Sequence, residues 1–364
     1  MFIAVCSCTN RTGSSENPGL PESKTVPADY FTNLFIRDCC GFTGGDGTYS
    51  VLLPDGRTVW IFGDTFLGTV NPDLTRERLS PMFIRNSFVV QDGDSLSTLH
   101  QVRPTHDASM VIPPAPNGQE ELSEDSVWFW PGDGLIENGK LLVFMSQFTQ
   151  LDTGMWGFHW QSTWLATFKL PDLTEEHIVE IPYGKATMVH YGHAVLEEEE
   201  FTYVYGARKD RDKKSRAHVA RYPAGNVNGV WEFYTGKEWT ENPDLTRPMG
   251  KMHASEQFTV LKIKEKYVYI TQMDWFSRDI CSFTSDTPYG PWGNKTLLYT
   301  TPIPGEDKNL ITYNAIAHPQ FIEEKHILLS YNMNSFALGD HFRNADIYRP
   351  RFVWVPLEII DPGF

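Results

Sequence analysis

The chain has 364 residues and a formal net charge of −15 at pH 7. This acidity argues against nucleic acids and anionic membranes as partners, because both attract basic proteins. Aromatic residues make up 13% of the chain, and the 28 glycines and 24 prolines are many, so the composition favours a soluble, all-β protein.

The N-terminal segment begins MFIAVCSCTN, a short apolar run that contains two cysteines. The run is too short to span a membrane, and it is similar to the end of a bacterial lipoprotein signal with Cys8 as the lipidated residue. An ordinary disordered N-terminus is the alternative. Because residues 9–26 are rich in Ser, Gly, Pro and Glu, residues 1–26 are predicted to form a disordered signal remnant and tether before a domain that spans 27–364. The expected location is therefore the bacterial periplasm or cell surface, with a membrane contacted only through the lipid anchor.

Residues 30–38 read YFTNLFIRD and are predicted to form an amphipathic strand without a hairpin partner of its own. The last repeat of the chain ends with a strand at 351–357. We expect the early strand to complete the last sheet, because this would remove an exposed sheet edge.

Residues 44–66, GGDGTYSVLLPDGRTVWIFGDTF, are typical of a β-hairpin. A strand at 48–53 and a strand at 58–62 flank a Pro-Asp-Gly turn. Asp46 precedes the first strand and Asp64 follows the second. The two carboxylates are therefore predicted to lie at the same rim of an antiparallel pair.

Four later segments repeat this pattern of polar anchor, apolar strand, charged turn and aromatic-rich strand, at 132–148, 192–208, 255–273 and 317–334. The later repeats begin about 60 residues apart, with no helical segment between their strands. This regularity predicts a five-bladed β-propeller closed by the N-terminal strand, whereas a two-sheet sandwich does not explain five matched hairpins. One equivalent position is occupied by Asp46, Asp133, His193, Glu256 and His318.

In a propeller, the inner strands of the blades surround one axis, so these five side chains are expected to converge. Crowding acids there is costly unless the acids serve a function. Acidic, amide and aromatic side chains together suit a sugar, because hydroxyls bond to the polar groups and the sugar's C–H face packs on a ring. The predicted ligand is an oligo- or polysaccharide. The predicted substrate-binding residues are Arg85, Asn86, Trp130, His193, Arg208, Tyr313, Asn314, His318 and Asn332.

Three motifs carry a family resemblance: the GGDG…WIFGDTF hairpin, IRNS at 84–87 and WPGDG at 130–134. They resemble the five-bladed β-propeller glycoside hydrolases, namely the endo-D-arabinanase family with an FGDT hairpin and related secreted bacterial propellers, and more distantly the arabinanase and β-xylosidase furanosidase clan. The motifs cover only about residues 44–134. The resemblance implies a funnel-shaped active site on the propeller axis and hydrolysis of a glycosidic bond by paired carboxylates.

The resemblance also implies roles for the acids. Asp46 and Asp64 correspond to the aspartates that matter most in the arabinanase-like relatives. The furanosidase clan places its acid on blade three, where this chain has His193, and the glutamate appears one blade later as Glu256. We expect Asp46 to act as nucleophile or base and Glu256 as general acid, with Asp64 or Asp133 adjusting pKa or holding a hydroxyl.

Other interpretations stay open. Each aspartate beside a glycine also fits a plain turn role. The cleft would suit a non-catalytic carbohydrate-binding propeller, or a metal-dependent hydrolase of the lactonase kind. Because the sequence contains no compact metal motif, no cofactor and no metal ligands are predicted, with a divalent cation on the axis as the alternative. The sugar, the linkage and the stereochemical course are not set by the sequence.

Overall fold

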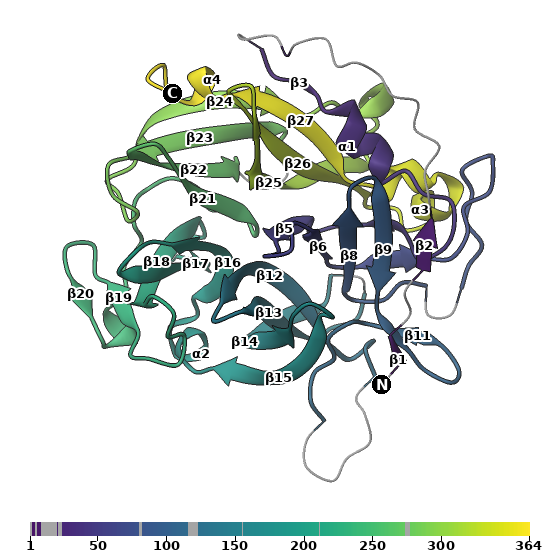
Figure 1. Cartoon of the computed structure of the whole chain (residues 1–364), viewed down its shortest axis with the longest axis horizontal. Coiled ribbons are helices and arrows are strands. Elements are labelled where there is room, and N and C mark those ends of the chain that lie inside the picture. The colour runs from purple at the N-terminus through teal and green to yellow at the C-terminus, as the bar shows by residue number, and fades with distance from the viewer. Residues whose placement is uncertain are drawn as a thin grey trace. The chain divides into compact units, whose positions relative to one another are not determined.

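The computed structural model describes residues 2–3, 6–8, 20, 24–79, 82–115, 123–154, 156–210, 212–273 and 277–364. The fold is an all-β, five-bladed β-propeller, as predicted (Figure 1). Among the described helices, none has the length and apolar character needed to cross a membrane. By its contacts the chain forms two compact units: unit 1 comprises residues 1–10, 34–185 and 337–349, and unit 2 comprises residues 11–33, 186–336 and 350–364.

Unit 1 contains blades one and two. Blade one has the strand order β2-β9-β8-β6-β5, with β2 at Cys6–Cys8, β9 at Ser95–Leu99, β8 at Ser87–Asp92, β6 at Thr58–Phe62 and β5 at Tyr49–Leu52. Blade two follows chain order, with β12 at Val127–Glu137, β13 at Lys140–Gln150, β14 at Phe158–Lys169 and β15 at Thr174–Ile181. Smaller elements are β1 (Phe2–Ile3), β4 (Phe42–Gly45), β7 (Thr65–Leu67), β10 (Gln101–Val102), β11 (Asp107–Ala108), α2 (Tyr183–Thr187), α3 (Asp340–Arg343) and η3 (Ala345–Tyr348).

Unit 2 contains blades three to five. Blade three has β16 (His190–Glu197), β17 (Phe201–Lys209), β18 (Ser215–Pro223), β19 (Glu232–Tyr234) and β20 (Trp239–Thr240). Blade four has β21 (Phe258–Ile263), β22 (Lys266–Gln272), β23 (Asp279–Ser285) and β24 (Gly293–Thr300). Blade five has β25 (Leu310–Glu323), β26 (His326–Ser335), β27 (Arg351–Pro356) and β3 (Val26–Pro27). The remaining elements are η1 (Pro243–Leu245), η2 (Pro304–Glu306), α1 (Asp29–Leu34) and α4 (Leu357–Ile360).

The five predicted hairpins are all present: β5–β6, β12–β13, β16–β17, β21–β22 and β25–β26. The turn between β12 and β13 shows why a hairpin could be recognised in the sequence. Asn138 and Gly139 between β12 and β13 have φ of 51° and 72°. Two consecutive positive φ values are the type I′ arrangement that joins twisted strands through two residues.

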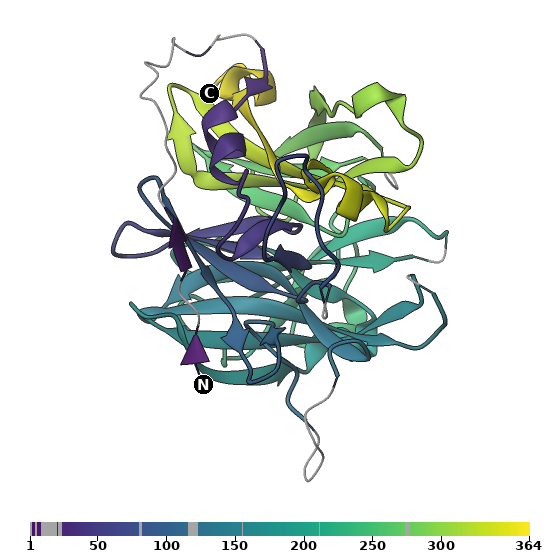
Figure 2. The ribbon, with the colours of Figure 1, turned by 90° about the vertical axis from the view of Figure 1, so that its right-hand side faces the viewer.

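The N-terminal closing strand was predicted at the wrong residues. An N-terminal strand does complete the last sheet, but it is β3, whose Val26 and Pro27 pair with Trp354 and Val353 of β27. Residues 29–34 form the helix α1 instead, which lies beside β27 in Figures 1 and 2. The apolar pattern of 30–38 has helical spacing, since the buried side chains are Phe31, Leu34 and Phe35.

The predicted tether of residues 1–26 is described only in part. Residues 6–8 form β2, which pairs with β9 at the edge of blade one, and residues 9–19 lie outside the described residues. The lipid anchor at Cys8 and the exported location stay predictions.

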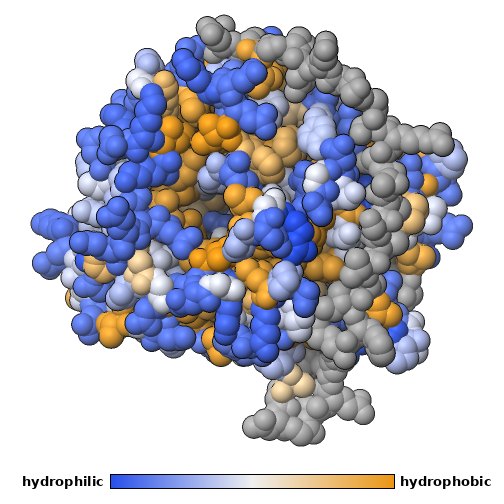
Figure 3. All heavy atoms as spheres, in the orientation of Figure 1, coloured by the Kyte–Doolittle hydropathy of each residue, from blue (hydrophilic) through white to orange (hydrophobic). Residues whose placement is uncertain are grey.

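Blades three and four of unit 2 share a core that positions the site described below. Ala194 of β16 and Phe258 of β21 belong to one cluster of buried side chains together with Tyr205 and Tyr269. This cluster fixes the start of β21 beside β16. Outside the core, hydrophilic side chains cover much of the visible surface (Figure 3), in keeping with the net charge.

Candidate functional site

Asp46 and Asp64 are neighbours in unit 1, as the hairpin predicts. The Asp46 N–H donates to the Asp64 carbonyl at 3.3 Å, and the Gly63 N–H donates to the Asp46 carbonyl at 2.7 Å. A Cβ at Gly63 would lie 2.7 Å from Asp46 Oδ1 and 3.6 Å from Trp130 Cδ1. The glycine therefore lets the Asp46 carboxylate and the Trp130 indole approach the same stretch of backbone.

The Asp64 carboxylate is held by two donors. Trp130 Nε1 donates to Asp64 Oδ1 at 2.7 Å, and Arg85 Nη1 lies 3.5 Å from both carboxylate oxygens. Only 16% of the Asp64 side chain is exposed. Burial raises the pKa of Asp64, while Arg85 and then the Trp130 hydrogen bond oppose that rise. Asp64 is thus a fixed, partly buried carboxyl group next to Asp46.

Arg85 is itself held in place. Its guanidinium lies over the Trp128 ring, 4.1 Å from the centroid, and its Nε donates to the Glu124 carbonyl at 3.2 Å. The stacked guanidinium can still reach Asp64, so Arg85 positions that carboxylate. Arg85 was predicted to bind substrate, and in the structure it contacts the Asp64 carboxylate.

Asn86, which was predicted to bind substrate, lies inside the fold. The residue has no exposed surface. Its amide nitrogen donates to the carbonyls of Val111 and Phe129, and its amide oxygen accepts from the Val111 N–H. Asn86 therefore ties the segment that follows blade one to β12.

Three inner strands carry an irregularity at the same place. The pairing register shifts between Pro131 and Gly134 in β12, between Tyr191 and Ala194 in β16, and between Tyr313 and Ile316 in β25. Asp133 and His193 lie inside the first two bulges. Bulges redirect side chains and are frequent beside active sites.

The bulges correct the alignment of blade five. The residue of β25 that matches Asp133 and His193 is Ala315, whereas His318 lies beyond the bulge. His318 has no exposed surface, and its Nε2 is 3.0 Å from Ser330 Oγ. Burial lowers the pKa of His318 to about 3. The alignment of His318 with Asp133 and His193 was wrong because β25 is 14 residues long and contains several polar residues.

The other predicted binding residues of unit 2 have mixed outcomes. Asn332, which was predicted to contact a saccharide, has no exposed surface. Asn314 lies in the β25 bulge with φ of 56° and little exposed surface. The Tyr313 hydroxyl accepts from Asn334 Nδ2 at 2.9 Å. Arg208 donates to the Thr187 carbonyl at 3.3 Å and to Asp210 at 3.4 Å.

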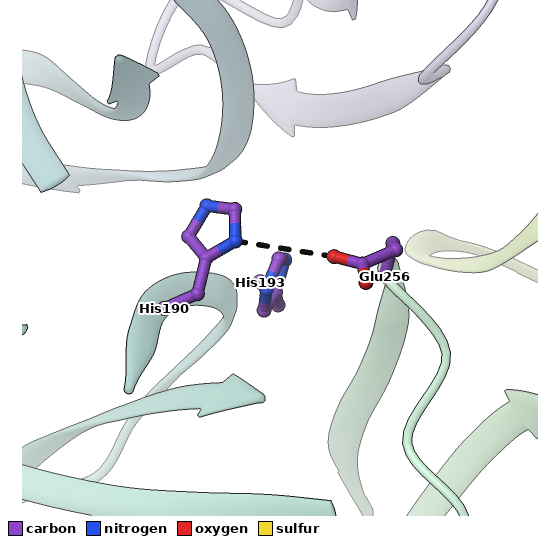
Figure 4. A group of neighbouring side chains, drawn as sticks. All are labelled: His190, His193 and Glu256. Carbon is purple, nitrogen blue, oxygen red and sulfur yellow. Dashed lines mark ion pairs between the residues drawn. The ribbon is translucent and has the colours of Figure 1, made fainter. Parts of the chain in front are cut away.

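A second group of functional side chains lies in unit 2, where His190, His193 and Glu256 point toward one another (Figure 4). The two imidazole centroids are 4.1 Å apart, and His190 Nδ1 lies 3.9 Å from Glu256 Oε2. Sequence reasoning found two of these residues and missed His190. In a regular strand, residues three apart point to opposite faces. The β16 bulge, in which Gly192 has φ of 99°, breaks this alternation and brings the rings together.

Burial sets the charge of this group. It lowers the pKa of His193 to about 3 and holds that of His190 well below its usual range, with the neighbouring His193 adding to the effect on His190. The surrounding protein raises the pKa of Glu256, and Lys209 opposes that rise. Because 70% of the Glu256 side chain is exposed, solvent limits the rise in the pKa of Glu256. Both imidazoles are therefore neutral at pH 7 beside an accessible carboxyl group.

Asp133 has a local role in addition to any function. Its Oδ1 accepts from the Gly134 N–H at 2.9 Å, the turn-like contact that its glycine neighbour allows. Its place in the β12 bulge nevertheless puts it three residues from Trp130, which bonds to Asp64.

Comparison with known proteins identifies one family and several similar structures. The family described as "Domain of unknown function (DUF5005)" matches residues 28–356, and no curated protein matches the chain. A structure described as a "putative hydrolase" from Bacteroides ovatus ATCC 8483 is 24% identical, with a TM-score of 0.76 over 91% of this chain and 90% of that one. An exo-beta-1,3-galactanase from Phanerochaete chrysosporium with bound beta-1,3-galactotriose is 11% identical, with a TM-score of 0.50 over 94% of this chain and 66% of that one.

A GH43_1 enzyme from Xanthomonas citri is 14% identical, with a TM-score of 0.48 over 91% of this chain and 89% of that one. At such identities the similarity concerns the fold. The chain therefore shares its fold with the Bacteroides ovatus and Phanerochaete chrysosporium structures.

Proposed function

Since the chain belongs to the DUF5005 family, for which no function is defined, we propose from the site itself that it is a glycoside hydrolase acting on an oligo- or polysaccharide with arabinofuranosyl linkages. The observation that carries the proposal is one rim of unit 1, where the backbones of Asp46 and Asp64 are hydrogen-bonded and Trp130 and Arg85 hold the Asp64 carboxyl group. Paired carboxyl groups are what most glycosidases use. The arabinofuranosyl substrate rests on the resemblance of this hairpin to the FGDT family.

The proposed roles follow from the environment of each carboxyl group. Asp46 is the nucleophile or base. Asp64 is too firmly held by Arg85 and Trp130 to leave its place, so it orients a substrate hydroxyl and adjusts the pKa of Asp46. Glu256 is assigned the role of general acid because its carboxyl group is accessible to a substrate. Asp133 is a further hydroxyl ligand.

Aromatic packing supports a sugar-binding role for the same rim. The Trp130 ring lies 4.6 Å from the Phe148 ring and 4.9 Å from the Phe158 ring, measured between centroids. Its half-buried indole is fixed by these contacts while its Nε1 bonds to Asp64. A rigid apolar surface next to a carboxylate matches the two chemical sides of a sugar ring.

The test is hydrolysis by the purified full-length chain. Aryl arabinofuranosides, xylosides and galactosides, together with arabinan-type polysaccharides, are offered, and released sugar is measured. We expect turnover of the arabinofuranosyl substrates. Asp46→Asn and Glu256→Gln should each lower kcat by about 10²- to 10⁴-fold while glycan affinity stays close to that of the wild type.

Glu199→Gln is the matched control, because Glu199 is exposed in the β16–β17 turn. It should leave turnover unchanged. Glycan binding by the wild-type chain without release of sugar from any substrate would contradict the hydrolase. It would favour a carbohydrate-binding propeller.

A further inference from the structure

We propose that His190, His193 and Glu256 bind a divalent first-row transition-metal ion, for which Zn²⁺ is the reference ion. Each residue offers one ligand atom, and these three atoms lie within 4.8 Å of one another. The site goes beyond the proposed hydrolysis, which needs carboxyl groups and no metal.

The separations are close to those of a metal site. For metal–ligand bonds of about 2.0–2.2 Å in tetrahedral geometry, ligand atoms lie about 3.3–3.6 Å apart. His190 Nδ1 and Glu256 Oε2 are 3.9 Å apart, so only a small movement is needed to bring both onto one ion. The Glu256 side chain can make that movement, because most of it is exposed.

The fold holds the two imidazoles in advance. His190 begins β16 and His193 lies in its bulge, and the His193 ring packs against the Phe258 ring at 5.9 Å between centroids. Phe258 is the first residue of β21, the strand that Glu256 precedes. Two ligands from one strand and a third from the next are therefore placed by backbone geometry, which lowers the ordering cost of binding.

The donor set selects the kind of ion. Imidazole nitrogen suits Zn²⁺, Fe²⁺, Ni²⁺ and Cu²⁺, whereas Ca²⁺ and Mg²⁺ take oxygen ligands almost exclusively. Three protein ligands also leave at least one coordination position open, as in catalytic rather than structural zinc sites. Water or a sugar hydroxyl would fill that position.

Metal binding has a consequence that rests on the proposed function. A Glu256 oxygen that is bonded to a cation cannot donate a proton to a leaving group. The bound ion should therefore inhibit hydrolysis, and removing it with a chelator should restore the activity.

The test is direct binding to the untagged full-length chain after treatment with a chelator. Calorimetry with Zn²⁺ and absorption spectroscopy with Co²⁺ should show one ion per chain, with a Kd of micromolar or lower and visible Co²⁺ ligand-field bands. Millimolar Ca²⁺ should not displace the ion. Glu256→Gln should weaken binding at least tenfold, and His190→Gln and His193→Gln should weaken it further.

The exposed residues His106 and Glu199 provide matched controls, so His106→Gln and Glu199→Gln should bind like the wild type. Glu256→Gln keeps the test decisive if a histidine variant fails to fold, because the Glu256 side chain is largely exposed. Binding that is unchanged in Glu256→Gln, or that Ca²⁺ abolishes, would overturn the site. A chain that binds zinc but shows no glycoside turnover after the metal has been removed would refute only the hydrolase, and turnover by a chain that does not bind zinc would refute only the metal site.

Discussion

His318 illustrates how burial of one side chain affects the whole protein at low pH. The folded-state pKa of His318 is about 3, below the ordinary value of 6.5. Between these pH values the unfolded chain therefore binds a proton that the folded chain does not bind. Stability is therefore lost as pH falls from about 6.5 toward 3. We expect His318→Gln, which keeps a partner for Ser330, to reduce the loss between pH 7 and pH 5 by about 2 kcal/mol.

Denaturant unfolding at the two pH values measures this difference. His106→Gln is the control, because the His106 side chain is exposed and should leave the pH dependence as it is. A His318→Gln variant whose stability falls as steeply as that of the wild type would show that His318 is protonated in the folded chain.

Trp130 offers a second test at the level of one residue. Its hydrogen bond favours the charged form of Asp64, so losing the bond should raise the pKa of Asp64 further. We expect Trp130→Phe to move the acidic limb of the kcat/KM profile upward. Trp156→Phe, at a residue that is 52% exposed, should leave the limb in place. An unmoved limb in Trp130→Phe would mean that Asp64 need not be charged for activity.

Single residues were predictable from the sequence when a local motif fixed them. Asp46 and Asp64 were placed correctly because an antiparallel hairpin brings its two ends together whatever surrounds it. His190 was missed because strand alternation places it opposite His193, and only the bulge reverses this. The backbone contacts of Asn86 were not foreseen, because a polar residue at a strand end looks the same in the sequence whether its partners are ligands or backbone groups.

Among the elements, the β16 bulge is the one on which the paired histidines depend. A left-handed backbone at Gly192 costs an alanine about 1–2 kcal/mol, so Gly192→Ala should destabilise the chain by that amount or straighten the strand. Either result should weaken Zn²⁺ binding at least tenfold. Calorimetry together with urea unfolding measures both effects.

Gly139→Ala separates backbone strain from site geometry. Gly139 has φ of 72°, and a Cβ there would meet no described atom within 4 Å. Its alanine variant should lose similar stability but bind zinc normally. Equal zinc affinity in Gly192→Ala and the wild type would show that the bulge does not position the ligands.

The outcome for whole elements depended on length. Short hairpins with charged turns were predicted correctly, since alternation and turn residues specify them locally. The 14-residue strand β25 was located correctly but aligned wrongly, because a long strand contains several polar candidates for one functional position. Residues 30–38 were predicted to form a strand, whereas residues 29–34 form a helix, because the apolar positions of so short a helix also suggest an amphipathic strand.

At the scale of the whole molecule, a buried aromatic side chain helps to hold residues 25–34 against blade five. Phe31 is buried, and its ring lies 4.8 Å from that of Phe321 and 5.8 Å from that of Trp354. We expect Phe31→Ala to lower the free energy of unfolding by about 3–5 kcal/mol. Limited proteolysis should then cut the segment around β3 before the rest of the chain unfolds.

Tyr30→Ala is the neighbouring control, because Tyr30 is 42% exposed. It should cost much less, by urea unfolding, than the change at Phe31. Equal losses at the two positions, or resistance of the segment to protease in Phe31→Ala, would show that β3 is held by its backbone bonds alone.

The pairing of β3 with β27 joins a strand made early in translation to one made near its end. During synthesis β3 has no partner until β27, which ends at Pro356, has left the ribosome. Until then β3 stays unpaired. A nascent chain in this condition is exposed to aggregation and to proteases for nearly the whole of translation. Truncation or frameshift near the C-terminus should therefore release the N-terminal segment as well, although the two lie more than three hundred residues apart in the sequence.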